Sequence, residues 1–417
     1  MWVGKDSFWF FLFPQGRRRI KCAIIRRVKR FVIAALASGA AFCAAAAPDV
    51  AALNAAREEI RALLAEDFRA LNGGNLSLVQ LADRVGDLAA ASNSAARARV
   101  LQEGAFNLYR AAGELQRAAE RRVPFWINLG TEAEFAFAAC PAGSFKMGFQ
   151  GDSTDVAFRH KVNITRPFWI ARYQTTKRLY DTFRKVGEMN REDKAYGGMD
   201  SPMGGIPRDA IDAFCAFLTK RNKGRIPEGY VFRLPTDAEW EYALNANCDD
   251  PEDPYVRFRN GDKTVEDEIS VTRKFADAVR AAHGISRLSN GSWVGPVMSG
   301  GRRKPNAWGI YDMLGNGAEM VLDTLPPNAV KIEYGEGVAG RENAFGYQDE
   351  ETDPLRFVGT QDVLFVFRGR PRWTRFAASW YCRTVRKGYP DSSHQQVFRV
   401  VLAPDILAGR PAKEAAR

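Results

Sequence analysis

The chain has 417 residues, of which 46% are apolar and 26% charged, which is typical of globular proteins and unlike disordered or fibrous chains. The formal net charge is +11, but residues 1–47 hold nine Lys and Arg against one Asp, which leaves +3 for the rest. This distribution excludes a protein that binds nucleic acid over its whole surface. The length suggests about two or three domains.

Residues 1–47 have the features of a secretory signal peptide. A basic segment at 26–30 precedes the apolar segment 31–37, and small residues follow at 44–47. The apolar segment is shorter than the ~20 residues that span a bilayer. We therefore expect export to the periplasm or the cell exterior, with membrane contact only through the export signal.

Residues 48–124 predict a helical hairpin or small bundle. They are rich in Ala, Arg, Glu and Leu, with apolar residues at helical spacing over 53–71 and again over 101–119. Asn72–Asn75 interrupts the pattern, and Ser77 is placed to cap a helix over 78–91. Both packing on the next domain and docking to a partner are compatible with this region.

Residues 125–404 predict an α+β domain with long loops, followed by a tail at 405–417. Short apolar or aromatic segments at 135–145, 168–173, 363–367 and 397–401 favour strands. Helices are expected at 208–222 and from Thr236, where Thr236 and Glu239 form a capping box. Because the cap accounts for Glu239, we expect no catalysis by the neighbouring carboxylates Asp237 and Glu241.

Several segments occur in the order that is typical of one protein family. They are 141–148, 168–176 followed by Tyr180 and Phe183, 209–215, and two signatures, the first at Phe232–Tyr242 and the second at Asn306–Asn316. Together they resemble the sulfatase-modifying factor family, whose best-known members are formylglycine-generating enzymes. The resemblance implies an irregular C-type-lectin-like α+β fold.

The resemblance also implies a structural calcium site after the second signature. The matching positions are side-chain oxygens of Asp312 and Glu319 and the carbonyls of Gly315 and Gly317. Several oxygens around a Gly-rich turn suit a hard cation. The alternative is that the two carboxylates only hydrogen-bond the turn. Ala318 and Met320 stand where the family has aromatic residues that shape its groove.

The copper centre of the family's oxidases is not expected here. In those enzymes two cysteines five residues apart bind copper, which suits a soft cuprous ion. The corresponding positions are Arg372 and Ala377, and no cysteine lies between Cys248 and Cys382. We therefore expect no copper and no oxidase activity of that kind.

The resemblance implies one disulfide, between Cys248 and Cys382. The family partner of Cys215 would fall near Val400, which is not a cysteine. Cys215 is then either a buried free thiol or the partner of Cys140.

The region after residue 367 holds the densest basic patch of the chain. The plain interpretation is a set of surface cations and aromatic residues on strand faces. The alternative is a groove for a peptide, a protein segment or an acidic or sulfated glycan, because guanidinium groups bind carboxylate or sulfate and rings stack on sugars. Export makes nucleic acid a poor partner. The groove residues are Arg372, Trp373, Arg375, Trp380, Arg383 and Arg386.

Two function classes follow from these patterns. The first is an exported binding or scaffold domain that has lost the oxidase centre. The second is a divergent oxidoreductase that acts on a protein or peptide-derived substrate with a different centre. The missing cysteines favour the first, and the two intact signatures keep the second open.

Overall fold

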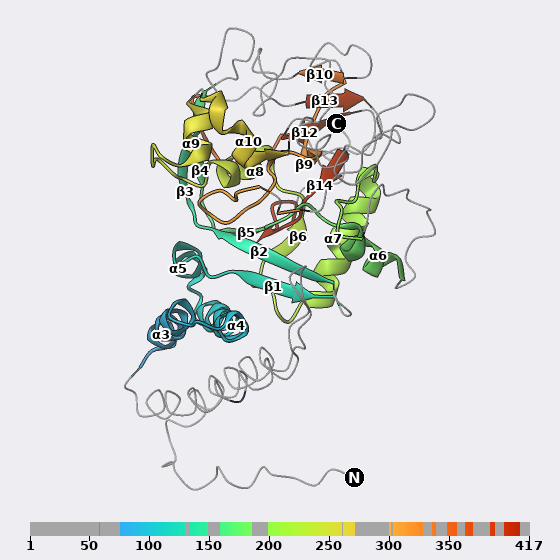
Figure 1. The fold of residues 1–417 in the computed structure, drawn as a ribbon. Coiled ribbons are helices and arrows are strands. Elements are labelled where there is room, and N and C mark those ends of the chain that lie inside the picture. Colours follow the sequence, from blue (N-terminus) through green and yellow to red (C-terminus); the bar gives the residue numbers. More distant parts are fainter. Residues whose placement is uncertain are drawn as a thin grey trace, which may run out of the picture. The chain divides into compact units, whose positions relative to one another are not determined.

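The computed structural model describes residue 58 and residues 76–129, 133–148, 159–185, 199–260, 262–271, 300–301, 303–327, 336–338, 348–356, 363–369, 384–387 and 396–408. The chain forms two compact units that divide after Glu114 (Figure 1). The predicted signal peptide lies outside the described residues. The same holds for the predicted first helix at 53–71, except Glu58, and for the predicted tail at 405–417 from residue 409 onward. Among the described residues no helix is long and apolar enough to cross a membrane.

The first unit is a helical hairpin of α3 (Leu78–Ala90) and α4 (Ala95–Ala112). Ser77 caps α3 in a capping box with Gln80, which confirms the predicted start of this helix. The helical pattern over 101–119 was predicted as one helix but belongs to two, because α4 ends at Ala112 with the cap residue Gly113 at a φ of 79° and a new helix starts at Leu115. The apolar faces of the two helices meet through Leu81, Val85, Val100, Leu101 and Leu108, which are buried.

The second unit begins with α5 (Leu115–Glu120) and contains an antiparallel five-stranded sheet. Figure 1 shows β1 and β2 side by side at its edge. The order in the sheet is β1 (Phe125–Asn128), β2 (Glu134–Cys140), β5 (Phe168–Ala171), β15 (Val401–Pro404) and β6 (Tyr230–Arg233).

A second five-stranded sheet carries the strand that follows the second signature. Its order is β10 (Glu336–Val338), β13 (Thr384–Lys387), β12 (Leu364–Arg368), β9 (Ala318–Leu325) and β14 (Gln396–Phe398). Strands β9 and β14 are parallel and the other pairs antiparallel. All eight residues of β9 are buried, so this strand lies inside the unit.

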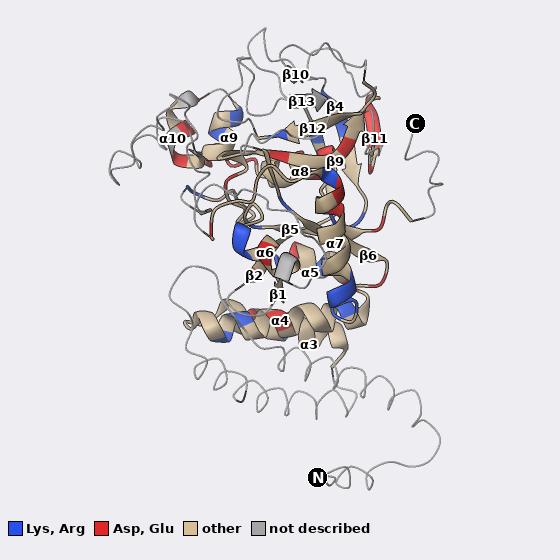
Figure 2. Ribbon diagram, turned by 90° about the vertical axis from the view of Figure 1, so that its right-hand side faces the viewer, with Lys and Arg blue, Asp and Glu red and all other residues tan. Residues whose placement is uncertain are grey.

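Two small sheets complete the strands. One has the order β11 (Glu350–Thr352), β4 (His160–Ile164) and β3 (Gly143–Met147), and the other pairs β7 (Ser270–Val271) with β8 (Leu314–Gly315). Figure 2 shows the acidic strand β11 in red, and its Glu350 accepts a hydrogen bond from Lys161 Nζ at 2.8 Å. This pair is exposed and adds little stability.

Besides α5, the described part of the second unit contains further helices. They are α6 (Lys177–Lys185), α7 (Arg208–Asn222), α8 (Asp237–Asn245), α9 (Pro254–Arg259) and α10 (Glu266–Ile269), with a 3-10 turn at Lys263–Val265. Helices α7 and α8 confirm the predictions at 208–222 and from Thr236. The side chains of α8 lie in the core, where Tyr242 packs edge-on against Trp308 with ring centroids 5.0 Å apart.

Two predicted strands turned out to be two strands each. The segment 135–145 divides into β2 and β3, because Pro141 provides no backbone N–H for a ladder. The segment 397–401 divides between β14 and β15, which belong to different sheets. Arg399 lies at this division, fully buried. The chain therefore changes sheets at a charged residue, and the fold is α+β as predicted.

Candidate functional site

The end of the second signature bends sharply from Asp312 through β8 to the turn that leads into β9. Asp312, Gly315 and Asn316 have φ values of 55°, 88° and 61°, and the Gly317 N–H donates to the Gly315 carbonyl at 2.7 Å. This conformation is left-handed at three positions, which only Gly, Asn and Asp adopt readily. The loop thus directs its carbonyls inward, toward the side chain of Gln174.

Gln174 brings together three of the four predicted ligand residues. Its Nε2 lies 3.2 Å from the Asp312 carbonyl oxygen, 3.3 Å from the Gly317 carbonyl oxygen and 2.9 Å from Glu319 Oε1. The Gln174 carbonyl oxygen accepts from Asn316 Nδ2 at 3.1 Å. All four contacts are buried, and the sequence analysis missed Gln174.

Glu319 is fully buried and paired with Arg399. Arg399 Nε donates to Glu319 Oε2 and Arg399 Nη2 to Oε1, each at 2.5 Å. Trp240 Nε1 of α8 donates to Oε2 at 2.7 Å. A carboxylate in such a bidentate pair has its charge balanced and its lone pairs used. The glutamate that follows the second signature is therefore linked directly to the tryptophan of the first.

Arg399 also binds the backbone of two other segments. Nη1 donates to the Ala171 carbonyl at the end of β5, and Nη2 to the Tyr311 carbonyl, both at 3.0 Å. Beside it, the rings of Tyr173 and Tyr311 are stacked with centroids 4.9 Å apart. Arg399 thus fixes the end of β5, the signature loop and the start of β9 relative to each other.

Asp312 differs from Glu319 in its contacts. Its Oδ2 accepts from the Gly301 N–H at 2.7 Å, whereas its buried Oδ1 accepts no hydrogen bond. Burial raises the pKa of Asp312 to about 6, because the charged form loses its hydration.

The described groups fit a calcium ion poorly. Calcium takes roughly six to eight oxygen ligands, but both oxygens of Glu319 and the carbonyl of Gly317 already accept hydrogen bonds from protein donors. Asp312 Oδ1 is the single candidate ligand atom without such a donor. Among the described residues no group of three or more His, Cys, Asp and Glu side chains could hold a metal ion. The calcium site stays a prediction of the resemblance.

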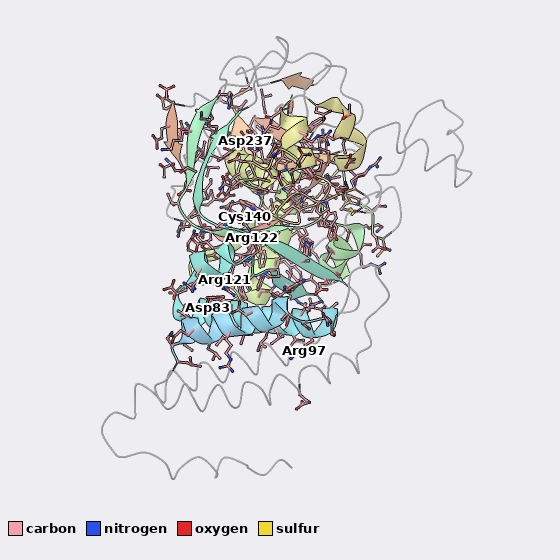
Figure 3. All side chains as sticks on the ribbon, turned by 60° about the vertical axis from the view of Figure 1, so that its left-hand side comes forward. Asp83, Arg97, Arg121, Arg122, Cys140 and Asp237 are labelled. Atoms are coloured by element: carbon pink, nitrogen blue, oxygen red, sulfur yellow. The ribbon has the colours of Figure 1, made fainter. Side chains whose placement is uncertain are left out.

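A second buried charge cluster lies around α8, whose Asp237 is labelled in Figure 3. Glu239 completes the predicted capping box with Thr236 and pairs with Arg233 through two contacts of 2.7 Å. Glu241 pairs with Arg368, which also lies 3.4 Å from Asp237. These signature carboxylates are therefore used in buried ion pairs.

The same cluster contains the buried Asp323 of β9. It accepts the N–H groups of Asp237 at 2.7 Å and Arg356 at 2.8 Å. Burial and the nearby Asp237 carboxylate raise the pKa of Asp323 to about 7. The sequence did not predict a role for Asp323. It predicted Arg368 as part of the basic patch, whereas the structure shows Arg368 buried.

Cysteine pairing is visible in part. Within the described residues Cys140, Cys215 and Cys248 form no disulfide with one another, so the alternative of a Cys140–Cys215 disulfide is wrong. Burial raises the pKa of the Cys140 thiol well above its usual range, and Arg122, labelled beside it in Figure 3, opposes this shift. Cys382 lies outside the described residues, so its pairing with Cys248 stays a prediction.

The predicted ligand groove is described at one position. Arg386 lies in β13, in register with Glu336 of β10 and Phe365 of β12. The other groove residues lie outside the described part of the chain: Arg372, Trp373, Arg375, Trp380 and Arg383. The groove therefore stays a prediction.

Comparison with known proteins identifies the family. Residues 131–403 match the sulfatase-modifying factor enzyme 1-like domain, whose fold is C-type-lectin-like. No curated protein matches the chain by sequence.

Several solved structures resemble the chain, PvdO, Treponema denticola variable protein 1 and CarF among them. PvdO from Pseudomonas aeruginosa is 21% identical, with 67% of this chain and 97% of that chain covered and a TM-score of 0.42. Treponema denticola variable protein 1 is 18% identical, with 68% of this chain and 99% of that chain covered and a TM-score of 0.44. CarF is 15% identical, with 64% of this chain and 99% of that chain covered and a TM-score of 0.38. With the family match covering most of its length, this chain belongs to the sulfatase-modifying factor enzyme 1-like (formylglycine-generating-enzyme-like) family.

Proposed function

We propose that this protein is a binding or scaffold member of its family that works without the copper oxidase centre. One sequence observation carries the proposal: Arg372 and Ala377 stand at the two copper-ligand positions, and no cysteine lies between Cys248 and Cys382. Neither alanine nor a charged guanidinium replaces a thiolate as a ligand of a cuprous ion. The signature carboxylates do not offer a substitute, because Glu239, Glu241 and Glu319 are each paired with a buried arginine.

The ligand in this proposal is acidic: a peptide or protein segment rich in carboxylates, or a sulfated or acidic glycan. The basic and aromatic residues between 372 and 386 support it, since guanidinium groups form paired hydrogen bonds with carboxylate and sulfate. Arg368 does not belong to this surface, because it is buried against Glu241.

Binding is tested with the full chain against fluorescent heparin fragments and a poly-glutamate peptide. Arg372→Ala combined with Arg383→Ala should weaken binding at least tenfold. Lys220→Ala, which removes an exposed charge from α7, should leave binding unchanged. Equal loss in both variants, or no binding of either probe, would overturn the acidic ligand.

The oxidase part is tested separately. The chain loaded with copper(I) is mixed with a cysteine-containing peptide, and oxygen uptake and peptide mass are followed. We expect no uptake above that of free copper. Conversion of the peptide cysteine to an aldehyde would instead establish the divergent enzyme.

Export is also part of the proposal, supported by the basic and apolar segments at 26–37. Mass spectrometry of the protein from the periplasm and the medium should find a mature N-terminus near residue 48. An intact N-terminus in the cytoplasmic fraction would overturn export.

A further inference from the structure

The side chains around Glu319 perform the role that a bound cation would have in this loop. Each oxygen of the Glu319 carboxylate accepts two hydrogen bonds from protein donors: Oε1 from Gln174 and Arg399, and Oε2 from Trp240 and Arg399. A buried carboxylate is costly unless its charge is paired and its oxygens are hydrogen-bonded. Both conditions are met here by the chain itself.

The amide nitrogen of Gln174 lies where the oxygens of the loop converge. It is within 3.3 Å of the Asp312 carbonyl, the Gly317 carbonyl and Glu319 Oε1. Asn316 Nδ2 donates to the Gln174 carbonyl oxygen, which fixes the amide with its nitrogen toward these three acceptors. A cation that bound the same oxygens would have to occupy the position of this nitrogen.

Repulsion between a cation and Arg399 supports the same conclusion. The buried groups are two carboxylates, Asp312 and Glu319, and one guanidinium, Arg399. A divalent cation on Glu319 would share that carboxylate with a guanidinium whose nitrogens lie 2.5 Å from its oxygens. The two positive groups would repel each other in a site from which water is excluded.

We propose that Arg399 and Gln174 close this site and replace a structural calcium ion, so that the domain is stable without calcium. Gln174 is the determining residue, because its nitrogen is a donor at the point where a ligand oxygen would be needed. Asp312 Oδ1, which accepts no hydrogen bond, is one oxygen and provides too few ligands by itself.

The proposal predicts that a single substitution creates a calcium requirement. Gln174→Glu replaces the donor nitrogen by an oxygen that faces three other oxygens, which is repulsive without a cation and favourable with one. Thermal unfolding of the full chain is measured in EGTA and in millimolar calcium. The melting temperatures of the wild type in EGTA and in calcium should agree within about 1 °C. The variant should melt at a lower temperature than the wild type in EGTA, and calcium should raise its melting temperature by about 5 °C or more.

Two controls make the test specific. Gln80→Glu makes the same chemical change at an exposed position of the α3 capping box and should show no calcium response. Magnesium, which demands a tighter octahedral geometry, should not replace calcium in Gln174→Glu.

The proposal is overturned if calcium raises the wild-type melting temperature by several degrees, or if folded Gln174→Glu ignores calcium. If Gln174→Glu does not fold, Asp312→Asn provides the test. If the site is closed as proposed, Asp312→Asn melts at or above the wild-type melting temperature both with and without calcium. A calcium site would instead make Asp312→Asn less stable than the wild type in calcium only.

Discussion

Glu239 offers the sharpest test of the view that the first signature stabilises the fold. Its carboxylate accepts the Thr236 N–H at 2.9 Å and pairs with Arg233 through two contacts of 2.7 Å. The side chains of Glu239 and Arg233 are only 9% and 5% exposed. Glu239→Ala therefore removes a helix cap and leaves a buried guanidinium without its counter-charge.

The expected cost follows from these two losses. Removing one partner of a buried ion pair costs about 3–5 kcal/mol, and losing a capping interaction costs about 1 kcal/mol. Because both effects involve one side chain, we expect about 4 kcal/mol for Glu239→Ala rather than a simple sum. Glu239→Gln, which keeps an acceptor oxygen but not the charge, should cost about 2 kcal/mol. Thr236→Ala, which removes only the hydroxyl cap, should cost about 1 kcal/mol.

Urea unfolding followed by tryptophan fluorescence measures these differences in the second unit. No tryptophan occurs between Trp9 and Trp126, so the signal reports little from the helical hairpin. The urea midpoint should fall in the order wild type, Thr236→Ala, Glu239→Gln and Glu239→Ala, with a last step of about 1 M or more. The reasoning is refuted if the free energy of unfolding of Glu239→Ala lies within about 1 kcal/mol of the wild-type value, which is about the effect expected for Thr236→Ala.

Three further predictions concern other parts of the chain. Tyr109→Phe removes the 2.5 Å hydrogen bond to Asp83, so amides of α3 and α4 should exchange about tenfold faster with deuterium; unchanged exchange would contradict this. Gly369→Ala should lower the free energy of unfolding in urea by more than about 2 kcal/mol, because Gly369 has a φ of +80° and a Cβ there would lie 2.6 Å from the Met313 carbonyl oxygen. The control Gly224→Ala should be near neutral, because a Cβ at Gly224 would have open space. Asp323 has a pKa raised to about 7, so the folded state holds more protons than the unfolded state between about pH 4 and 8. Stability should therefore fall as pH rises through this range, by up to about 2 kcal/mol from pH 5.5 to 8. Asp323→Asn should flatten this pH profile, and an unchanged slope would show that Asp323 does not titrate there.

Local sequence patterns predicted the helix caps and helices α7 and α8, but not the eight-residue strand β9. Ser77 and the pair Thr236 and Glu239 were recognised because capping depends on residues three positions apart. The division of segment 397–401 was missed because its residues are apolar except Arg399, and the assignment of its halves to two sheets depends on partners far away in the sequence. Strand pairing of that kind cannot be obtained from local periodicity.

The site was predicted only as far as the family motif extends. Asp312, Gly317 and Glu319 do lie together, but the groups that contact them, Gln174 and Arg399, lie 145 and 80 residues away from Glu319 in the sequence. One signal was present in the sequence: a single arginine within an apolar segment predicts a buried ion pair, because such a charge is costly without a partner. The identity of the partner required the fold.

These contacts explain how the two signatures can persist in a chain without the oxidase cysteines. Glu239, Glu241 and Glu319 are each matched to one buried arginine, respectively Arg233, Arg368 and Arg399. Trp240 joins the last two pairs, since its Nε1 donates to Glu319 at 2.7 Å and its ring lies 5.0 Å from the Arg368 guanidinium carbon. Loss of any one of these groups would leave a buried charge unpaired, whatever chemistry the domain performs. The signatures therefore report the fold, and the residues at 372 and 377 report whether the oxidase centre is present.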